Sequence, residues 1–173
     1  MNLSEFFDTR YAEFSPYDEI EGNKWSYSPL TTVGHFDMNG WLNLDDGSVV
    51  CSEFAPDHWI FSTLWTPDDQ DHPVSGNREF GFFVPENPSG GDPYYVFYTR
   101  GADRPTGLLD YAVSNTIFAA AHSLWTSFQV KLTLFIDKNG GEANLRHPYS
   151  CRYDWDTVRA SYHNPTPTTP WLD

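Results

Sequence analysis

The feature that most constrains the fold of this 173-residue chain is a run of apolar residues at helical spacing in its second half. Apolar side chains recur at steps of three or four, which places them on one face of an α-helix. The members are Leu109, Val113, Ile117, Ala120, Leu124, Phe128, Leu132 and Phe135, with Phe118 and Trp125 widening the stripe. Asn139-Gly140-Gly141 follows and is typical of a helix C-cap. We therefore predict one continuous helix from about Leu108 to Lys138.

Short segments rich in β-branched and aromatic residues precede this stripe and are separated by turn signals. We predict strands at Thr31–Leu44, Ser48–Phe54, His58–Trp65, Arg78–Val84 and Tyr94–Arg100. Short connections between successive strands favour an antiparallel meander. A wide apolar helix face needs a broad partner surface, which the meander can supply. The predicted fold is α+β, an antiparallel β-meander of about five or six strands packed around one long amphipathic helix.

The two ends of the chain are less regular. A short helix is predicted around Leu3–Phe14, an extended segment over Glu142–Trp155 and a helical turn over Asp156–Tyr162. We predict a single α+β domain over residues 1–162 and a proline-rich tail over residues 163–173. The order of a sheet followed by a long helix is similar to that of helix-grip folds. This resemblance is one of architecture and implies no particular function.

The net charge of the chain indicates which classes of partner it can bind. The chain carries 24 acidic and 10 basic residues, for a formal net charge of -14. Such a charge repels phosphate backbones and anionic lipid surfaces, so neither nucleic acid nor membrane is an expected partner. A basic protein would instead be attracted. No inference on oligomeric state follows.

The first residues and the cysteines suggest a location. The start, MNLSEFFDTRYAEF, has early acidic residues and no apolar core of a secretory signal, so a cytoplasmic location is expected, with signal-independent export left open. In a reducing cytoplasm, Cys51 and Cys151 are expected to be buried thiols rather than a disulfide.

The segment Thr99–Pro105 contains two of the few cations, Arg100 and Arg104, flanking Asp103. We predict that it forms a loop between the last strand and the long helix, where a helix N-terminus favours anions. The arginines could then clamp a carboxylate or phosphate, with Asp103 orienting one of them or acting as a base. A structural ion-pair network is the alternative.

A second polar cluster precedes and enters the fourth predicted strand. It comprises Asp68, Asp69, Asp71 and His72, followed by Arg78 and Glu79. Carboxylates with a histidine can bind a divalent cation or act in acid–base catalysis, but this spacing matches no known calcium or zinc motif. His35 and Asp37 would share one face of a strand, which is a weak metal signal. We predict neither a metal nor a cofactor.

Three functions remain open on the sequence alone, and whether the chain is an enzyme is one of the open points. The first is an acidic interaction module, such as an inhibitor or immunity-type protein that binds a basic partner. The second is an enzyme or toxin-like effector without a common motif. Its catalytic cleft would contain Arg100, Asp103, Arg104, Arg78, Glu79 and His72. The third is a binder of small apolar ligands between sheet and helix, ranked last because the many aromatic residues favour a filled interior.

Overall fold

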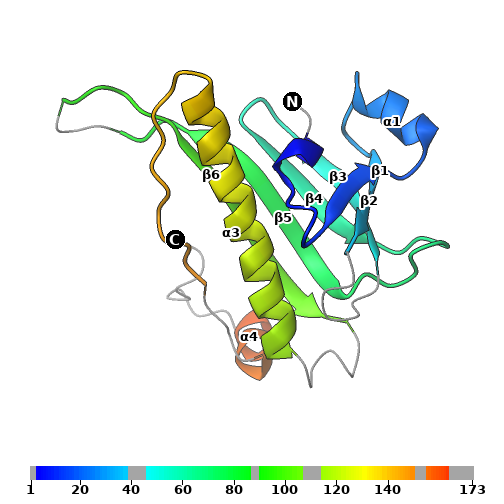
Figure 1. Ribbon diagram of the computed structural model, residues 1–173. Helices are drawn as coiled ribbons and strands as arrows, with labels where there is room; N and C mark the ends of the chain where they lie inside the picture. Colours follow the sequence, from blue (N-terminus) through cyan, green and yellow to red (C-terminus); the bar gives the residue numbers. More distant parts are fainter. Residues whose placement is uncertain (1–2, 39–45, 87–89, 107–113, 151–154, 164–173) are drawn as a thin grey trace.

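The computed structural model describes residues 3–38, 46–86, 90–106, 114–150 and 155–163. The elements, in chain order, are η1 (Leu3–Phe6), β1 (Glu13–Pro16), α1 (Glu19–Trp25), β2 (Val33–Asp37), β3 (Gly47–Phe54), β4 (His58–Leu64), β5 (Val74–Phe83), β6 (Val96–Pro105), α3 (Ser114–Lys138) and α4 (Trp155–His163). The strands form one sheet and α3 runs across one face of it (Figure 1). The predicted α+β fold, with six antiparallel strands and one long helix, is confirmed.

The sheet is a meander in which each strand pairs with its sequence neighbour, in the order β1-β2-β3-β4-β5-β6. All five pairings are antiparallel. The longest ladder joins β5 to β6 and aligns Val74 with Pro105 at one end and Phe83 with Val96 at the other. Strand β6 is therefore an edge strand of the sheet.

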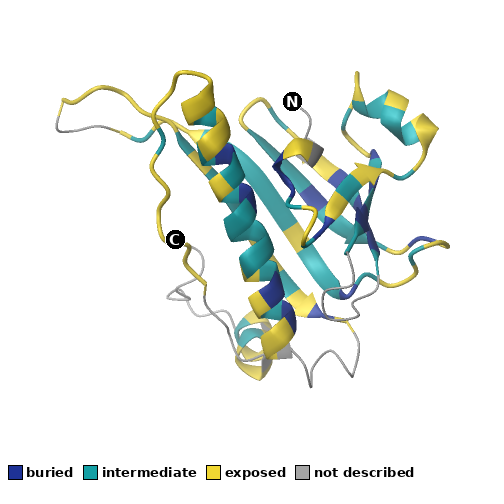
Figure 2. Cartoon of the chain, in the orientation of Figure 1, coloured by how far each residue is buried: buried dark blue, intermediate teal, exposed yellow. Residues whose placement is uncertain are grey.

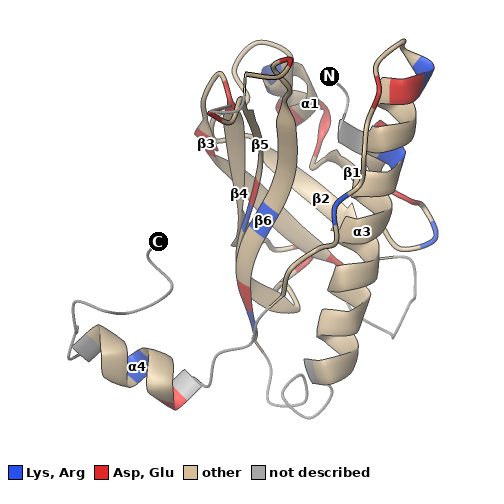
Figure 3. Cartoon of the chain, turned by 90° about the vertical axis from the view of Figure 1, so that its left-hand side faces the viewer, with Lys and Arg blue, Asp and Glu red and all other residues tan. Residues whose placement is uncertain are grey.

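Helix α3 confirms the predicted helix over residues 114–138, while Leu109 and Val113 lie outside the described residues. Its C-terminal cap is the predicted one. Gly140 has a φ of 86°, which favours glycine, and the Gly141 N–H donates to the Ile136 carbonyl over 3.0 Å. Residues 114–130 contain no Asp, Glu, Lys or Arg, so most of the helix is tan in Figure 3.

The core lies between α3, the N-terminal segment and the helix-facing side of the sheet (Figure 2). Its centre is aromatic: the Phe7 ring lies 5.0 Å from that of Phe36 and 5.4 Å from that of Phe128, centroid to centroid. Lys131 fixes the N-terminal segment by donating from Nζ to the Phe7 carbonyl over 2.5 Å. Within the predicted stripe on α3, Ile117, Ala120, Phe128 and Leu132 are buried, whereas Phe135 is 48% exposed.

Two local predictions are wrong. Leu3–Phe14 is not one helix: it contains η1 and the start of β1. Residues 142–150, in the segment predicted to be extended, form neither a helix nor a strand of the sheet. Thr99–Pro105 is not a loop before the helix but the second half of β6, because β5 begins at Val74 and provides a ten-residue partner for that segment. The cations of this segment therefore lie on a strand.

Candidate functional site

The alternation of side chains along β5 and β6 divides the predicted site residues between two faces of the sheet. On the inner face, which faces α3, Arg78 pairs with Asp103. On the outer face, Glu79 pairs with Arg100. The structure therefore contains two separate polar clusters instead of one cleft that holds all the predicted residues.

The inner cluster is a desolvated ion pair. Arg78 donates from Nη2 to Asp103 Oδ2 over 2.8 Å, and the two side chains are 17% and 19% exposed. Burial raises the pKa of the Asp103 carboxyl, and Arg78 opposes this shift. Burial also lowers the pKa of Arg78, which stays charged because its ordinary pKa of 12.5 is so high.

The Arg78 guanidinium lies between the sheet and the helix. Its central carbon lies over the Trp125 ring of α3, 4.5 Å from the centroid, which is a cation–π contact. On the sheet, a Cβ at Gly101 would come within 2.6 Å of the same carbon, so only glycine leaves room for the guanidinium. Arg78 Nε is buried without a hydrogen-bond partner among the described residues.

His72 reaches the inner face from the connection between β4 and β5. Its ring covers Gly47, where a Cβ would come within 2.2 Å of the ring, and Nδ1 accepts a hydrogen bond from the Val74 N–H at 3.2 Å. Burial lowers the pKa of His72 to about 4. The ring is therefore neutral at pH 7, and because Nδ1 accepts, its proton is on Nε2.

A cavity of about 120 Å³ lies between α3 and the inner face of the sheet. Its walls are mainly apolar, and its aromatic members are Phe7, Phe14, Phe36, Phe61, Phe80 and Trp125. His72, Arg78 and Asp103 are the charged or titratable groups among its described walls, apart from the Tyr11 phenol. The interior between sheet and helix is therefore not completely filled, although its aromatic rings contact one another at tilted and edge-on angles.

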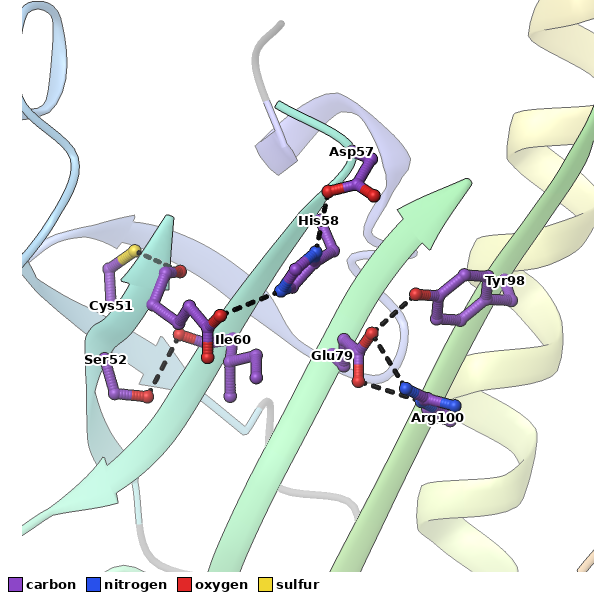
Figure 4. A network of polar contacts seen from close by, with 9 residues as sticks. Cys51, Ser52, Asp57, His58, Ile60, Glu79, Tyr98 and Arg100 are labelled. Atoms are coloured by element: carbon purple, nitrogen blue, oxygen red, sulfur yellow. Dashed lines mark hydrogen bonds and ion pairs between the residues drawn. The ribbon is translucent and has the colours of Figure 1, made fainter. Parts of the chain in front are cut away.

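The outer cluster is joined by hydrogen bonds across β5 and β6 (Figure 4). Arg100 donates from Nε to Glu79 Oε2 over 2.8 Å and from Nη2 to Oε1 over 3.1 Å. Tyr98 donates its hydroxyl proton to Glu79 Oε1 over 2.5 Å, and burial together with this bond raises the pKa of Tyr98 to about 12. The Arg100 side chain is 72% exposed, so the cluster is open to solvent.

His58 lies on the same outer face between two carboxylates. Its Nδ1 is 2.8 Å from Asp57 Oδ1 and its Nε2 is 3.0 Å from Glu53 Oε1. The hydrogen bonds to Asp57 and then to Glu53 raise the pKa of His58. With both ring nitrogens donating, the imidazolium form is favoured. In both clusters on the outer face, the charged groups are therefore paired with one another.

The other predicted residues occupy separate places. Arg104 is exposed on β6 opposite Ser75. Asp69 accepts hydrogen bonds from Ser48 Oγ over 2.5 Å and from His35 Nδ1 over 2.9 Å, with its side chain 7% exposed. Within the described part of the chain, no three histidines, cysteines or carboxylates gather as a metal site.

Cys51 is a free thiol in the core, and Cys151 lies outside the described residues. Burial raises the pKa of Cys51 to about 11, which favours the unreactive thiol form. The predicted role of Cys51 as a buried thiol is confirmed.

The aromatic lining of the cavity was not predicted. Phe7 and Phe14 come from an N-terminal region whose sequence shows only weak periodicity, so nothing in it indicated contact with the helix. The alternation of Arg78, Phe80 and Phe82 along one strand was the available signal, because it places an arginine among apolar inward residues.

Comparison of the chain with protein-family models, with curated proteins and with solved structures finds no match. Among the described helices, none has the length and apolar character needed to cross a bilayer.

Proposed function

We propose that the protein binds a small, mainly apolar ligand in the cavity between α3 and the sheet. The observation that carries this proposal is the cavity itself: a space of about 120 Å³ with mainly apolar, aromatic walls and a few polar groups among its lining residues. Small-molecule sites generally combine apolar walls with a few placed polar groups. An engineered apolar cavity of about 150 Å³ is large enough for benzene.

Thermal unfolding in the presence of benzene tests this function. A ligand that binds only the folded chain raises its stability, by about 2.7 kcal/mol at one hundred times its dissociation constant. We expect Tm to rise with benzene concentration in the wild type. We expect no rise in Ala121→Leu, which adds volume at the cavity wall.

Ala119→Leu is the matched control because Ala119 is exposed on the same helix. It should respond to benzene as the wild type does. Equal Tm shifts in both variants, or no shift in the wild type, would contradict the proposal.

Binding of a basic protein is a second proposal. The net charge of -14 supports it, as do two exposed apolar side chains in and just after α1, near acidic residues in the sequence. Ile20 is 73% exposed and Tyr27 is 79% exposed, close in sequence to the exposed carboxylates Asp18 and Glu19. Apolar residues rimmed by charge are typical of interaction surfaces. A cytoplasmic location and an immunity-type role stay predictions.

Affinity capture from host cells at low salt, with wild type and the variant Glu19→Lys/Ile20→Asp, tests the second proposal. A basic protein retained by the wild type and lost with the variant is the expected result. Equal retention by both proteins, or no basic protein retained, would contradict it.

A further inference from the structure

The chemistry of the cavity wall limits what the ligand can be, and this inference rests on the proposed function. Size is the first limit. The cavity of about 120 Å³ is close to the volume of about 150 Å³ that holds one benzene ring, so one ring fills it. The surrounding phenylalanines, including Phe36, Phe61 and Phe80, offer ring faces and edges to such a molecule.

The second limit is hydrogen bonding. Arginine has five N–H groups in one plane, and among the described residues Arg78 uses one nitrogen, Nη2, to bond Asp103. Trp125 contacts the guanidinium from α3 and Gly101 lies against it on the sheet, and because the N–H bonds lie in the guanidinium plane, a ligand acceptor bonds them at its edge. His72 adds an N–H on Nε2, because its Nδ1 accepts from Val74. The cavity wall therefore offers hydrogen-bond donors at the edge of the guanidinium. A ligand that bonds them must carry a hydrogen-bond acceptor.

The third limit is charge. Arg78 is already neutralised by Asp103 at 2.8 Å, and a second anion here would lie beside that carboxylate in a desolvated place. A cation would face Arg78 and the donor N–H of His72. A neutral acceptor satisfies the free N–H groups without adding a buried charge.

We propose that the cavity takes a neutral molecule of one aromatic ring whose hydrogen-bond acceptor meets the in-plane N–H groups of Arg78. The ring packs among the phenylalanines of the sheet and against α3. The acceptor sits at the edge of the guanidinium.

Binding of four probes to the wild-type chain, measured by calorimetry at pH 8, tests this inference. The probes are benzene, pyridine as a neutral acceptor of the same size, benzoate as an anion and benzylamine as a cation. One net hydrogen bond of about 1 kcal/mol corresponds to a severalfold change in affinity. We expect pyridine to bind threefold to tenfold more tightly than benzene, and both ions to bind more weakly than pyridine.

¹⁵N spectra of the arginine side chains report directly on whether a ligand contacts Arg78. Pyridine should shift the Arg78 guanidinium signals in the wild type, and benzene should shift them much less. The variant Arg78→Met/Asp103→Leu removes both charges together, which avoids leaving one buried charge unpaired. It should still bind benzene and should lose the preference for pyridine.

The outcomes separate the two proposals. If benzene binds and pyridine binds no more tightly, the inference about the acceptor is overturned and the cavity function stands. If benzoate or benzylamine binds more tightly than pyridine, the inference that the ligand is neutral is wrong. If no probe binds, both the inference and the proposed function fail.

Discussion

Arg78 and Glu79 are neighbours in the sequence, yet the two faces of the sheet give them different environments. Arg78 pairs with a buried carboxylate beneath α3, whereas Glu79 pairs with Arg100, whose side chain is 72% exposed. The donor–acceptor distance is 2.8 Å in both pairs. The donor–acceptor distance alone therefore does not show how much an ion pair contributes to folding stability. The inner pair is desolvated and borders a cavity, while the outer pair is screened by water.

The largest effect on stability is expected when the inner pair is broken. Asp103→Ala leaves Arg78 buried without its counter-charge, and we expect the free energy of unfolding to fall by about 3 kcal/mol. Urea unfolding at pH 7 measures this change. Asp103→Asn is the control for shape, because it retains an acceptor but not the charge. A loss below about 1 kcal/mol for Asp103→Ala would show that the pair is solvated like the outer one.

The second effect comes from the inner histidine. The folded-state pKa of His72 is about 4, against 6.5 ordinarily, so between these values the unfolded chain binds a proton that the folded chain excludes. Stability should therefore fall as pH drops from 6.5 to 4, by up to about 3 kcal/mol for this group. Urea unfolding at pH 7, 5 and 4 for the wild type and His72→Gln isolates the contribution as a difference. A pH-independent difference would contradict burial of the ring.

The outer histidine provides a comparison of opposite sign. The pKa of His58 is raised by Asp57 and Glu53, so its stabilising contribution is complete below the ordinary value of 6.5 and is lost as pH rises through the raised pKa. The advantage of the wild type over His58→Gln should thus shrink at high pH. For His72 the advantage should shrink at low pH.

A third effect tests the space beneath the guanidinium. Gly101→Ala would place a methyl group within 2.6 Å of Arg78 Cζ, and we expect a loss of about 2 kcal/mol from the displaced pair. Thermal unfolding measures it. Ala102→Val is the control, since Ala102 is exposed and its side chain alternates to the outer face. Equal, small effects of the two substitutions would mean that the guanidinium is free to move.

The smallest effect is expected on the outer face. Arg100→Ala removes an exposed partner of Glu79 and should change the free energy of unfolding by less than about 0.5 kcal/mol. High salt should reduce even this difference between wild type and variant, as urea unfolding at two ionic strengths would show. A loss of stability near that of Asp103→Ala would mean that the inner and outer ion pairs do not differ in their contribution.

The long helix and the meander could be predicted because their periodicities are strong. The spacing of Ile117, Leu124 and Phe128 indicates a helix without further information, and the glycines at its end mark the cap. The N-terminal strand β1 could not be predicted in the same way. It has four residues, includes Pro16, and pairs with β2 only through tertiary contacts.

The residues singled out in the sequence do not come together in one place. Arg78, Asp103 and His72 line the cavity, whereas Glu79, Arg100 and Arg104 are not part of its lining. Asp103 was predicted to lie in a loop, and Gly101 and Pro105 on either side of it are residue types uncommon inside strands. In the structure, Gly101 accommodates the Arg78 side chain, and Pro105 is the last residue of an edge strand. Such close approaches depend on the register between strands, which one strand's sequence does not contain.

The cavity between α3 and the sheet can be seen by X-ray diffraction from crystals equilibrated with xenon. We expect xenon density among Phe36, Phe80 and Trp125, because an apolar cavity of this size, about 120 Å³, can bind xenon. Protein side chains filling that space, with no xenon between helix and sheet, would contradict it.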